Sequence, residues 1–293
     1  MEAETLTFSN GPLRFSALAM GQGPVVLCLH GFPDNANSFR YQLPALAEAG
    51  YRAIALTLRG YEPSSIPDSG DYSMGALAAD VVAVIDQLEE SKVHLVGHDW
   101  GAAIAYTVGA ACPERLHSVT TMAVPHAGRF SRQGTRYLKQ LRLSWYMGFF
   151  QLRGFSDYWV QRNDFAFIKR LWGDWSPGWT PEEGVLENVI ESLSAPGVVA
   201  AALGYYRAGL TVSALTQPVE EAFFKVPVPT LALSGELDGC IDSAIFEQLM
   251  CSEDFPEGLR FQRISGAGHF LHQEKPDDVN MALLNWLRTN TAV

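Results

Sequence analysis

Residues 97–101 read Gly-His-Asp-Trp-Gly and directly follow the apolar run Val-His-Leu-Val at residues 93–96. A turn of small residues around a central reactive side chain, placed after a buried strand, is typical of a nucleophile elbow. In such an elbow the chain turns sharply from strand to helix and lifts the central side chain, here Asp99, above the sheet. Glycine is needed beside it because a bulky residue would clash in so tight a turn.

The central residue of this elbow is an aspartate, whereas most such elbows carry a serine. A serine suits acyl transfer, but a carboxylate attacks an electrophilic sp³ carbon and forms an ester with the protein itself. A serine esterase is therefore excluded, and the predicted chemistry has two steps. The second step must free the carboxylate from its ester, which requires a base to activate water and a partner to orient that base.

The candidates for the base and its partner follow two late predicted strands. His269 comes after a strand and a Gly-Ala-Gly loop, and Asp238 comes after the preceding strand. Because active sites of open α/β sheets lie outside the carboxyl ends of the strands, both side chains should reach the elbow. The chain order nucleophile, acid, histidine is a known order of a catalytic triad. Two rival acids and one rival histidine, which is expected to face away, lie nearby: Glu236, Asp242 and His272.

A loop after the predicted strand at residues 25–29 reads His-Gly-Phe-Pro at residues 30–33. Its position predicts an oxyanion hole, in which the backbone N–H groups of Phe32 and Trp100 donate to one oxygen of Asp99. The same donors would stabilise the tetrahedral oxyanion that forms when water attacks the ester. One such donor contributes about 3–4 kcal/mol to transition-state stabilisation.

Strand and helix signals alternate on both sides of the elbow. Apolar runs predict strands at residues 13–19, 25–29, 51–56, 93–96, 116–124, 228–233 and 259–264. Helical spacing occurs at residues 38–49, 74–88, 101–111 and 276–288. Alternation at this spacing predicts an α/β fold with a mostly parallel, doubly wound sheet.

The alternation stops between residues 127 and 215, a stretch that carries five of the seven tryptophans and reads as several helices. The simplest organisation is a core domain of residues 1–126 and 216–293 with a helical lid, residues 127–215, inserted in it. The lid begins with basic residues at three- or four-residue steps, a pattern typical of a solvated helix face: Arg129, Arg132, Arg136, Lys139 and Arg142.

The composition limits the partners of the chain. Its 293 residues carry 21 Lys and Arg against 32 Asp and Glu, a net charge of −11, which argues against nucleic acid and anionic membrane surfaces. No apolar run reaches about 18 residues, so no membrane span is predicted. Four scattered cysteines without metal-ligand spacing, and a start without a signal-peptide pattern, predict a cytoplasmic enzyme without metal or cofactor. A homodimer is left open.

Several motifs resemble those of the α/β-hydrolase-fold epoxide hydrolases, and the resemblance covers nearly the whole chain. Residues 30–34 and 40–46 resemble that family's first signature, and residues 59–61 resemble its next loop. The elbow and residues 268–270 are similar to its nucleophile and histidine segments. The resemblance implies an α/β-hydrolase fold and an enzyme that converts an epoxide to a vicinal diol through the triad inferred above.

The resemblance also implies acid groups in the lid. Such epoxide hydrolases carry two lid tyrosines that hydrogen-bond the epoxide oxygen and protonate it as the ring opens. Tyr146 and Tyr206 resemble these two residues, with Tyr205 as the alternative to Tyr206. A tyrosine, with a pKa near 10, donates a proton at neutral pH without first being ionised. The implied pocket takes an apolar or aromatic epoxide and water, and is lined by Pro33, Trp100, Trp145 and Phe270.

Haloalkane dehalogenases share the aspartate elbow and give the alternative prediction. They bind the departing halide with two side-chain N–H donors, of which Trp100 could be one. The other donor is usually an asparagine where this chain has Phe32, or a lid tryptophan such as Trp145 or Trp175. A hydrolase-fold receptor without activity is a further alternative, which the presence of every triad residue argues against.

Overall fold

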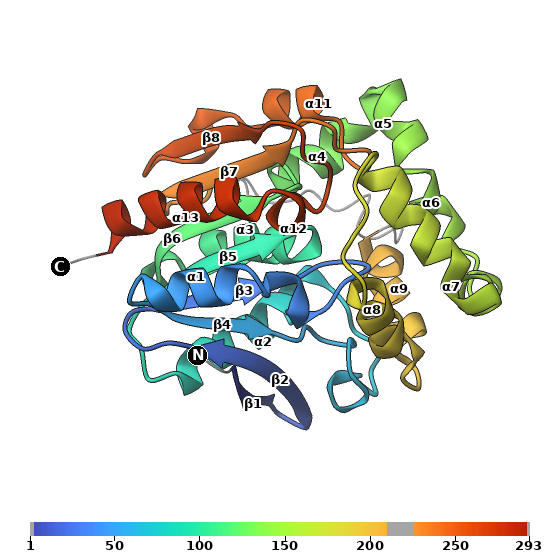
Figure 1. The fold of residues 1–293 in the computed structure, drawn as a ribbon, viewed down its shortest axis with the longest axis horizontal. Helices are drawn as coiled ribbons and strands as arrows, with labels where there is room; N and C mark the ends of the chain where they lie inside the picture. The colour runs from blue at the N-terminus through green and yellow to red at the C-terminus, as the bar shows by residue number, and fades with distance from the viewer. Residues whose placement is uncertain (1–2, 210–224, 292–293) are drawn as a thin grey trace.

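The computed structural model describes residues 3–209 and 225–291, in which eight strands form one sheet (Figure 1). The order across the sheet is β1-β2-β4-β3-β5-β6-β7-β8. The pairs β1–β2 and β2–β4 are antiparallel, and the other pairs are parallel. The strands are β1 (Glu4–Asn10), β2 (Leu13–Met20), β3 (Val25–Leu29), β4 (Arg52–Leu56), β5 (Val93–His98), β6 (Leu116–Met122), β7 (Thr230–Gly235) and β8 (Leu259–Ile264). The predicted fold class, a mostly parallel α/β sheet, is confirmed.

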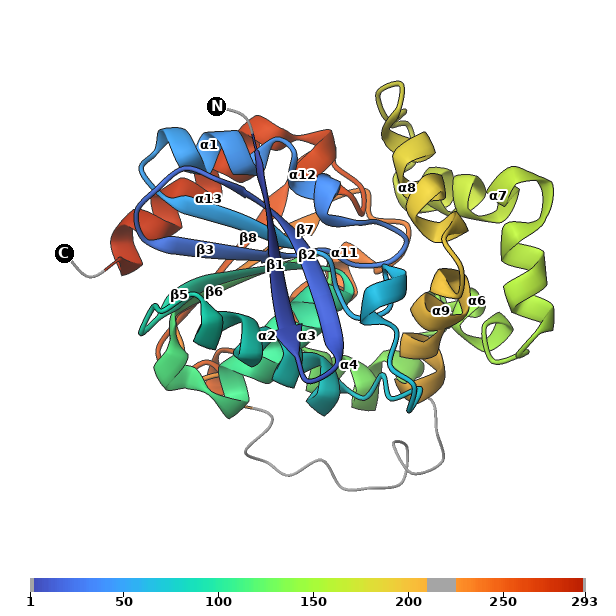
Figure 2. The same ribbon diagram turned by 90° about the horizontal axis from the view of Figure 1, so that it is seen from below.

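Helices cover both faces of the sheet (Figure 2). One face packs against α1 (Gln42–Glu48), α12 (Leu271–Glu274) and α13 (Pro276–Asn290), and the other against α2 (Met74–Gln87) and α3 (Trp100–Ala111). The strands β3, β5 and β7 are buried along their whole length, because parallel strands between two helical layers have no solvent-facing side. Their carboxyl ends therefore meet at one buried edge, and the predicted site residues lie just beyond it.

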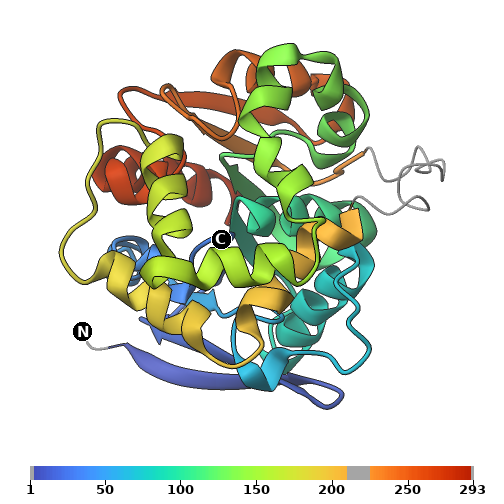
Figure 3. The ribbon, with the colours of Figure 1, turned by 90° about the vertical axis from the view of Figure 1, so that its right-hand side faces the viewer.

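A block of helices comes after β6 and gathers at one end of the sheet (Figures 2 and 3). These helices are α4 (Ala127–Gln133), α5 (Leu138–Leu143), α6 (Trp145–Phe149), α7 (Phe155–Trp175), α8 (Val185–Ser194) and α9 (Val198–Gly209). The backbone of α7 leaves the helical region at residues 162–165, so it consists of two segments. Trp100, directly after β5, contacts Tyr206 of α9, which places the block over the carboxyl edge. The predicted lid boundary at residues 215 and 216 lies outside the described residues.

Two elements near the N-terminus differ from the prediction. The strand β1 was not predicted, although its apolar residues alternate at Leu6 and Phe8. It is a partly exposed strand at the edge of the sheet and pairs with β2. The helix predicted from residue 38 begins at Gln42 instead, after a short 3₁₀ turn. Pro44 explains this start, because a proline has no N–H and is tolerated only in the first turn of a helix.

Among the described residues, no single helix is long and apolar enough to cross a membrane. The helices α8 and α9 together meet the length and composition of a span, but they are bent by 88° at the break between them.

Candidate active site

The nucleophile elbow forms as the sequence predicts. Asp99 joins β5 to α3 with φ 52° and ψ −118°, a backbone conformation that non-glycine residues rarely adopt. The neighbouring glycines are required by close backbone contacts: a Cβ on Gly97 would lie 2.2 Å from the Gly101 carbonyl oxygen, and one on Gly101 would lie 2.1 Å from that of Leu29. Such strain is typical of functional sites, and here it holds the carboxylate above the sheet edge.

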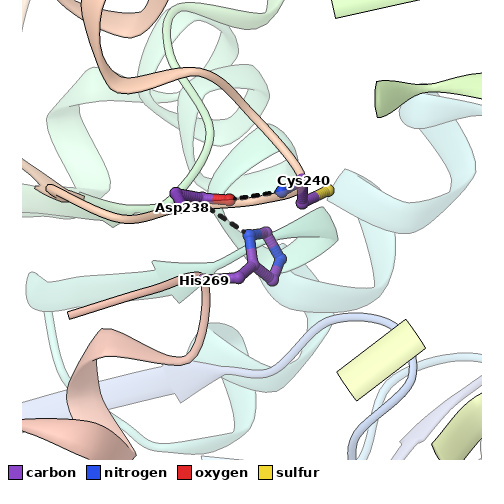
Figure 4. A group of neighbouring side chains, drawn as sticks. All are labelled: Asp238, Cys240 and His269. Atoms are coloured by element: carbon purple, nitrogen blue, oxygen red, sulfur yellow. Dashed lines mark hydrogen bonds and ion pairs between the residues drawn. The ribbon is translucent and has the colours of Figure 1, made fainter. Parts of the chain in front are cut away.

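The three predicted triad residues come together from three strand ends. His269 Nε2 lies 3.6 Å from Asp99 Oδ2. His269 Nδ1 lies 3.0 Å from Asp238 Oδ2, the contact drawn in Figure 4. The backbone N–H of His269 donates to the Trp175 carbonyl at 3.1 Å, which fixes the loop that carries the ring. Because all three side chains are buried, their mutual interactions are little screened by solvent.

The structure turns each rival residue away from this cluster. Asp242 caps α11 (Ser243–Leu249) and pairs with Lys139. Glu236 accepts hydrogen bonds from the Ser265 hydroxyl and the Gly266 N–H. The ring of His272 packs against those of His98 and Phe39 at 4.4 and 5.3 Å between centroids, on the far side of the histidine loop. Of the three candidate acids, Asp238 is therefore the one that hydrogen-bonds His269.

One of the two predicted oxyanion donors contacts the nucleophile. The Phe32 N–H donates to Asp99 Oδ1 at 2.7 Å. Residue 31 must be glycine, since a Cβ there would lie 2.3 Å from the same oxygen. The Trp100 N–H forms no hydrogen bond to this carboxylate within the described residues: Oδ1 is bound by Phe32, and Oδ2 faces His269. The Trp100 N–H as second oxyanion donor during the reaction stays a prediction.

Two carboxylates control the charge of His269. Burial alone would lower the pKa of its imidazole, but Asp238 and Asp99 favour the imidazolium and raise the pKa to about 10. The imidazolium form of His269 is therefore favoured at neutral pH. Any reaction that neutralises Asp99 removes one of these two stabilising charges, so the pKa of His269 falls at that point.

The lid places two tyrosines against this cluster. The ring of Tyr206 packs edge-on against Phe32, Trp100 and Tyr146 at centroid distances of 5.3, 5.0 and 5.7 Å. Both tyrosines are almost fully buried, and burial together with the nearby Asp99 charge raises the pKa of each hydroxyl well above its ordinary value. The Tyr206 hydroxyl makes no hydrogen bond of good geometry within the described residues. It is a protonated donor without a bound acceptor.

The alternative tyrosine is occupied elsewhere. The Tyr205 hydroxyl donates to the Arg59 carbonyl at 2.7 Å, and its ring packs against Tyr72 and Tyr61. Adjacent residues of a helix point about 100° apart, so Tyr205 and Tyr206 cannot both face Asp99. The structure assigns the site-facing position to Tyr206.

The predicted pocket residues have different positions. Trp100 and Pro33 flank Asp99 and the oxyanion loop, and the Pro33 carbonyl accepts a hydrogen bond from the Trp172 indole at 3.2 Å. Phe270 stacks on Trp172 at 4.1 Å and supports the histidine loop from behind. Trp145 is 45% exposed on the outer side of α6, because its neighbour Tyr146 takes the inward direction. This position does not support Trp145 as a pocket residue or as a halide donor.

Two further site residues are not evident from the sequence. The Trp175 ring lies 5.0 Å from both His269 and Tyr146. The Cys240 N–H donates to Asp238 Oδ1 at 2.7 Å, and its thiol lies 3.3 Å from the Tyr146 hydroxyl. The sequence indicates Trp175 only as one of two lid tryptophans that could bind a halide, not as a neighbour of His269 and Tyr146, and a lone cysteine two residues after the acid carries no spacing signal.

Three of these side chains have the ligand types of a metal site. One ligand atom each of Asp238, Cys240 and His269 lie within 4.8 Å of one another (Figure 4). The Asp238 oxygens, however, already accept bonds from His269 and from the N–H groups of Cys240 and Ile241. Burial raises the pKa of the Cys240 thiol well above its ordinary value, so the thiolate that a metal requires is disfavoured. The geometry is that of an acid orienting a base.

Comparison with known proteins agrees with this geometry. The family model described as alpha/beta hydrolase fold matches residues 24–276, so the chain is an enzyme of the α/β-hydrolase class. Human epoxide hydrolase 4 is 33% identical over 289 residues, covering 95% of this chain and 77% of the relative. Epoxide hydrolase A of Mycobacterium tuberculosis is 28% identical and covers 97% of each chain. The crystal structure of Bacillus megaterium epoxide hydrolase in complex with an inhibitor superposes with a TM-score of 0.85 at 29% identity, covering 97% of this chain and 100% of that one. The chain belongs to the epoxide hydrolase family.

Four buried histidines predict acid sensitivity. Burial lowers the pKa of His30 to about 4 and of His94 and His98 to about 3, and lowers that of His272 well below its ordinary value. In the unfolded chain each of these groups binds a proton near pH 6.5, so the free energy of unfolding falls as pH drops from there toward the folded pKa values. The cost is about 1.4 kcal/mol per pH unit for each histidine. Burial raises the pKa of Asp34 to about 7, so the folded chain binds a proton there as the pH falls. This stabilisation offsets the loss of stability caused by one of the four histidines.

The measurement is the urea midpoint at pH 7 and at pH 5, which we expect to fall strongly at the lower pH. His94→Gln provides the matched variant, because His94 is far from the triad and bonds only the Ser118 and Thr291 hydroxyls among the described residues. In the variant, the free energy of unfolding should depend less steeply on pH, by the amount that corresponds to the binding of one proton. Parallel pH profiles for the variant and the parent would contradict the assignment.

Proposed function

We propose that this enzyme hydrolyses an apolar or aromatic epoxide to a vicinal diol through a covalent ester on Asp99. The observation that carries the proposal is the position of the Asp99 carboxylate. It lies between a histidine–aspartate pair on the core side and two buried tyrosines of the lid. The family relationship to epoxide hydrolases supports the substrate class. Aromatic side chains around the cluster favour an apolar substrate.

In the first step, an Asp99 carboxylate oxygen attacks the less hindered ring carbon and the C–O bond on the far side breaks. The released oxygen is a strong base, and it takes a proton from the Tyr206 or Tyr146 hydroxyl. Tyr206, whose hydroxyl donates to no acceptor within the described residues, can donate to the epoxide at once. The proton that the tyrosine loses is restored from the His269 imidazolium, whose pKa has fallen because the ester carries no charge.

In the second step, neutral His269 takes a proton from water, and the resulting hydroxide attacks the carbonyl carbon of the ester. The Phe32 N–H, already bonded to Asp99 Oδ1, stabilises the tetrahedral oxyanion, and we assign the second donor to the Trp100 N–H. Collapse releases the diol and restores the carboxylate. One proton of the water ends on the diol and the other on His269, which returns to its imidazolium form.

A single turnover in ¹⁸O-labelled water tests this route. The hydrolytic water adds its oxygen to the ester carbonyl, so we expect label in the Asp99 carboxylate and none in the first diol released. The measurement is mass spectrometry of the peptide that contains Asp99, with enzyme in excess of styrene oxide. The control is the same incubation without epoxide, which should leave the peptide unlabelled. Label found only in the diol would mean that water attacks the epoxide directly, and the proposal would be wrong.

A further inference from the structure

The outer surface of the lid exposes an unusual number of large apolar side chains. Nine large hydrophobic residues are exposed in the described part of the chain, and seven of them lie between residues 138 and 159. Tyr158 is 61% exposed and Phe155 54% exposed, whereas such side chains are usually buried. We call these seven residues the outer lid patch: Leu138, Leu141, Trp145, Leu152, Phe155, Tyr158 and Trp159.

Ring contacts join the aromatic members of the patch across α6 and α7. Leu138 and Leu141 share one face of α5, and Trp145 is the first residue of α6, which follows after Ser144. Ring contacts at 6.2 Å join Trp145 to Phe149, and Phe149 to Phe155. Trp159 stacks on Phe155 at 5.8 Å, which continues the row along α7. Figure 1 shows α6 and α7 at the end of the molecule remote from the sheet and α5 beside α11, and Figure 3 views this end.

Exposed arginines accompany this patch. Arg142 lies one turn after Leu138 on the same helix, and Arg153 adjoins Leu152 in the sequence. The guanidinium of Arg162 lies over the Trp159 ring at 5.4 Å. Within the ranges that the structure describes, none of these three arginines forms an ion pair. Aromatic and aliphatic residues bordered by free cations are typical of helices that lie in a membrane interface.

Positive and negative charges are distributed unevenly between the first part of the lid and the rest of the chain. Residues 127–175 contain nine Lys and Arg against three Asp and Glu, a net charge of +6, and residues 127–156 contain no acid at all. The chain as a whole carries −11, so all other residues together carry −17. The whole lid, residues 127–215, contains ten Lys and Arg against seven Asp and Glu, a net charge of +3, so the excess of positive charge lies in its first part. An anionic surface would attract the lid and repel the opposite end, which orients the molecule.

A second copy of this chain is a poorer occupant. In a two-fold symmetric contact each patch meets an identical patch, so two surfaces of the same positive charge would come together. We propose instead that the outer lid patch docks on a bilayer that contains anionic phospholipid. The aromatic side chains lie among the headgroups, and Arg142, Arg153 and Arg162 bind lipid phosphates and carboxylates. Docking would place the lid next to the bilayer, where apolar molecules concentrate. The benefit of this position for an epoxide substrate rests on the proposed function, whereas the docking itself does not.

Vesicle sedimentation of the full chain tests the proposal without any catalysis. We expect binding to phosphatidylcholine vesicles that contain phosphatidylserine, weak binding to phosphatidylcholine alone, and release when salt is raised to about 1 M, where the Debye length is about 3 Å. Arg142→Gln/Arg153→Gln/Arg162→Gln should weaken the partition coefficient by about 10²-fold, since each cation near the surface contributes about a factor of five. Phe155→Ser/Trp159→Ser should weaken binding to the same vesicles and lower the quenching of Trp fluorescence by brominated lipid, with Trp145 as the exposed tryptophan that remains in the patch.

The matched control is Lys225→Gln/Arg260→Gln/Arg288→Gln, which removes the same charge from exposed positions outside the lid and should bind as the parent does. Equal loss in the control would show that net charge, and not the patch, governs binding. Equal binding to both kinds of vesicle would also overturn the proposal. A dimer in sedimentation equilibrium that Trp159→Ser dissociates, with no vesicle binding by the parent, would reassign the patch to a second copy. Hydrolysis of a water-soluble epoxide, measured in parallel, tests the proposed function separately.

Discussion

The His269→Gln variant is expected to form the Asp99 ester but to hydrolyse it about 10²–10⁴ times more slowly than the parent enzyme, the usual contribution of a general base. Glutamine preserves a hydrogen-bonding side chain of similar size next to Asp238, so the fold and the nucleophile should remain in place. Because His269 is needed mainly in the second step, alkylation should proceed while turnover stops. Intact-protein mass spectrometry should show one covalent adduct per chain that persists after free styrene oxide is removed.

Asp99→Ala serves as the control, because it removes the attacking atom and should give neither adduct nor diol. Circular dichroism should show both variants folded. A steady-state rate close to that of the parent in His269→Gln would contradict the mechanism, since another base would have to act. The structure offers little support for His272 in that role: its ring packs against His98 and Phe39 behind the histidine loop.

The triad could be predicted from sequence because its geometry is set by the sheet. Asp99, Asp238 and His269 each come after a strand, and parallel strands bring the loops at their carboxyl ends to one edge. Strong local signals mark these positions, above all the glycines of the elbow, where a Cβ would collide with backbone. The acid was harder to choose, since three carboxylates lie within seven residues after β7. Hydrogen bonds formed only in the fold distinguish Asp238 from its rivals.

The lid resisted prediction for a physical reason. Its helices have no sheet register to fix them, and the direction of each side chain depends on how the helices pack on one another and on the core. A rotation of about 100° separates neighbouring residues, which decides between Tyr205 and Tyr206 and between Trp145 and Tyr146. Trp175 reaches His269 only because α7 crosses back over the site after its break at residues 162–165. No residue spacing in the sequence predicts the direction of the second segment of α7.

Replacing both lid tyrosines should separate epoxide opening from dehalogenation. Tyr146→Phe/Tyr206→Phe is expected to lower kcat/KM for styrene oxide by about 10²–10⁴-fold, the range for loss of a general acid, with a smaller loss in Tyr206→Phe if Tyr146 compensates. The alkoxide that forms when an epoxide opens stays attached and is strongly basic, so it needs a proton. A halide leaves as a weak base and binds N–H donors instead. Any activity on a bromoalkane should therefore change little.

Tyr205→Phe is the matched control for this experiment. It removes a hydroxyl from the adjacent residue of the same helix, but that hydroxyl is bonded to the Arg59 carbonyl and not directed at Asp99. We expect a loss of about 1 kcal/mol in the free energy of unfolding, the net value of one hydrogen bond, and nearly unchanged kcat/KM. If the double variant kept full epoxide activity while Tyr205→Phe lost it, the acid would have to be assigned to Tyr205. Full activity in all three variants would remove the lid hydroxyls from the mechanism. The proton for the opening ring would then have to come from His269, the remaining cation that faces Asp99 at 3.6 Å.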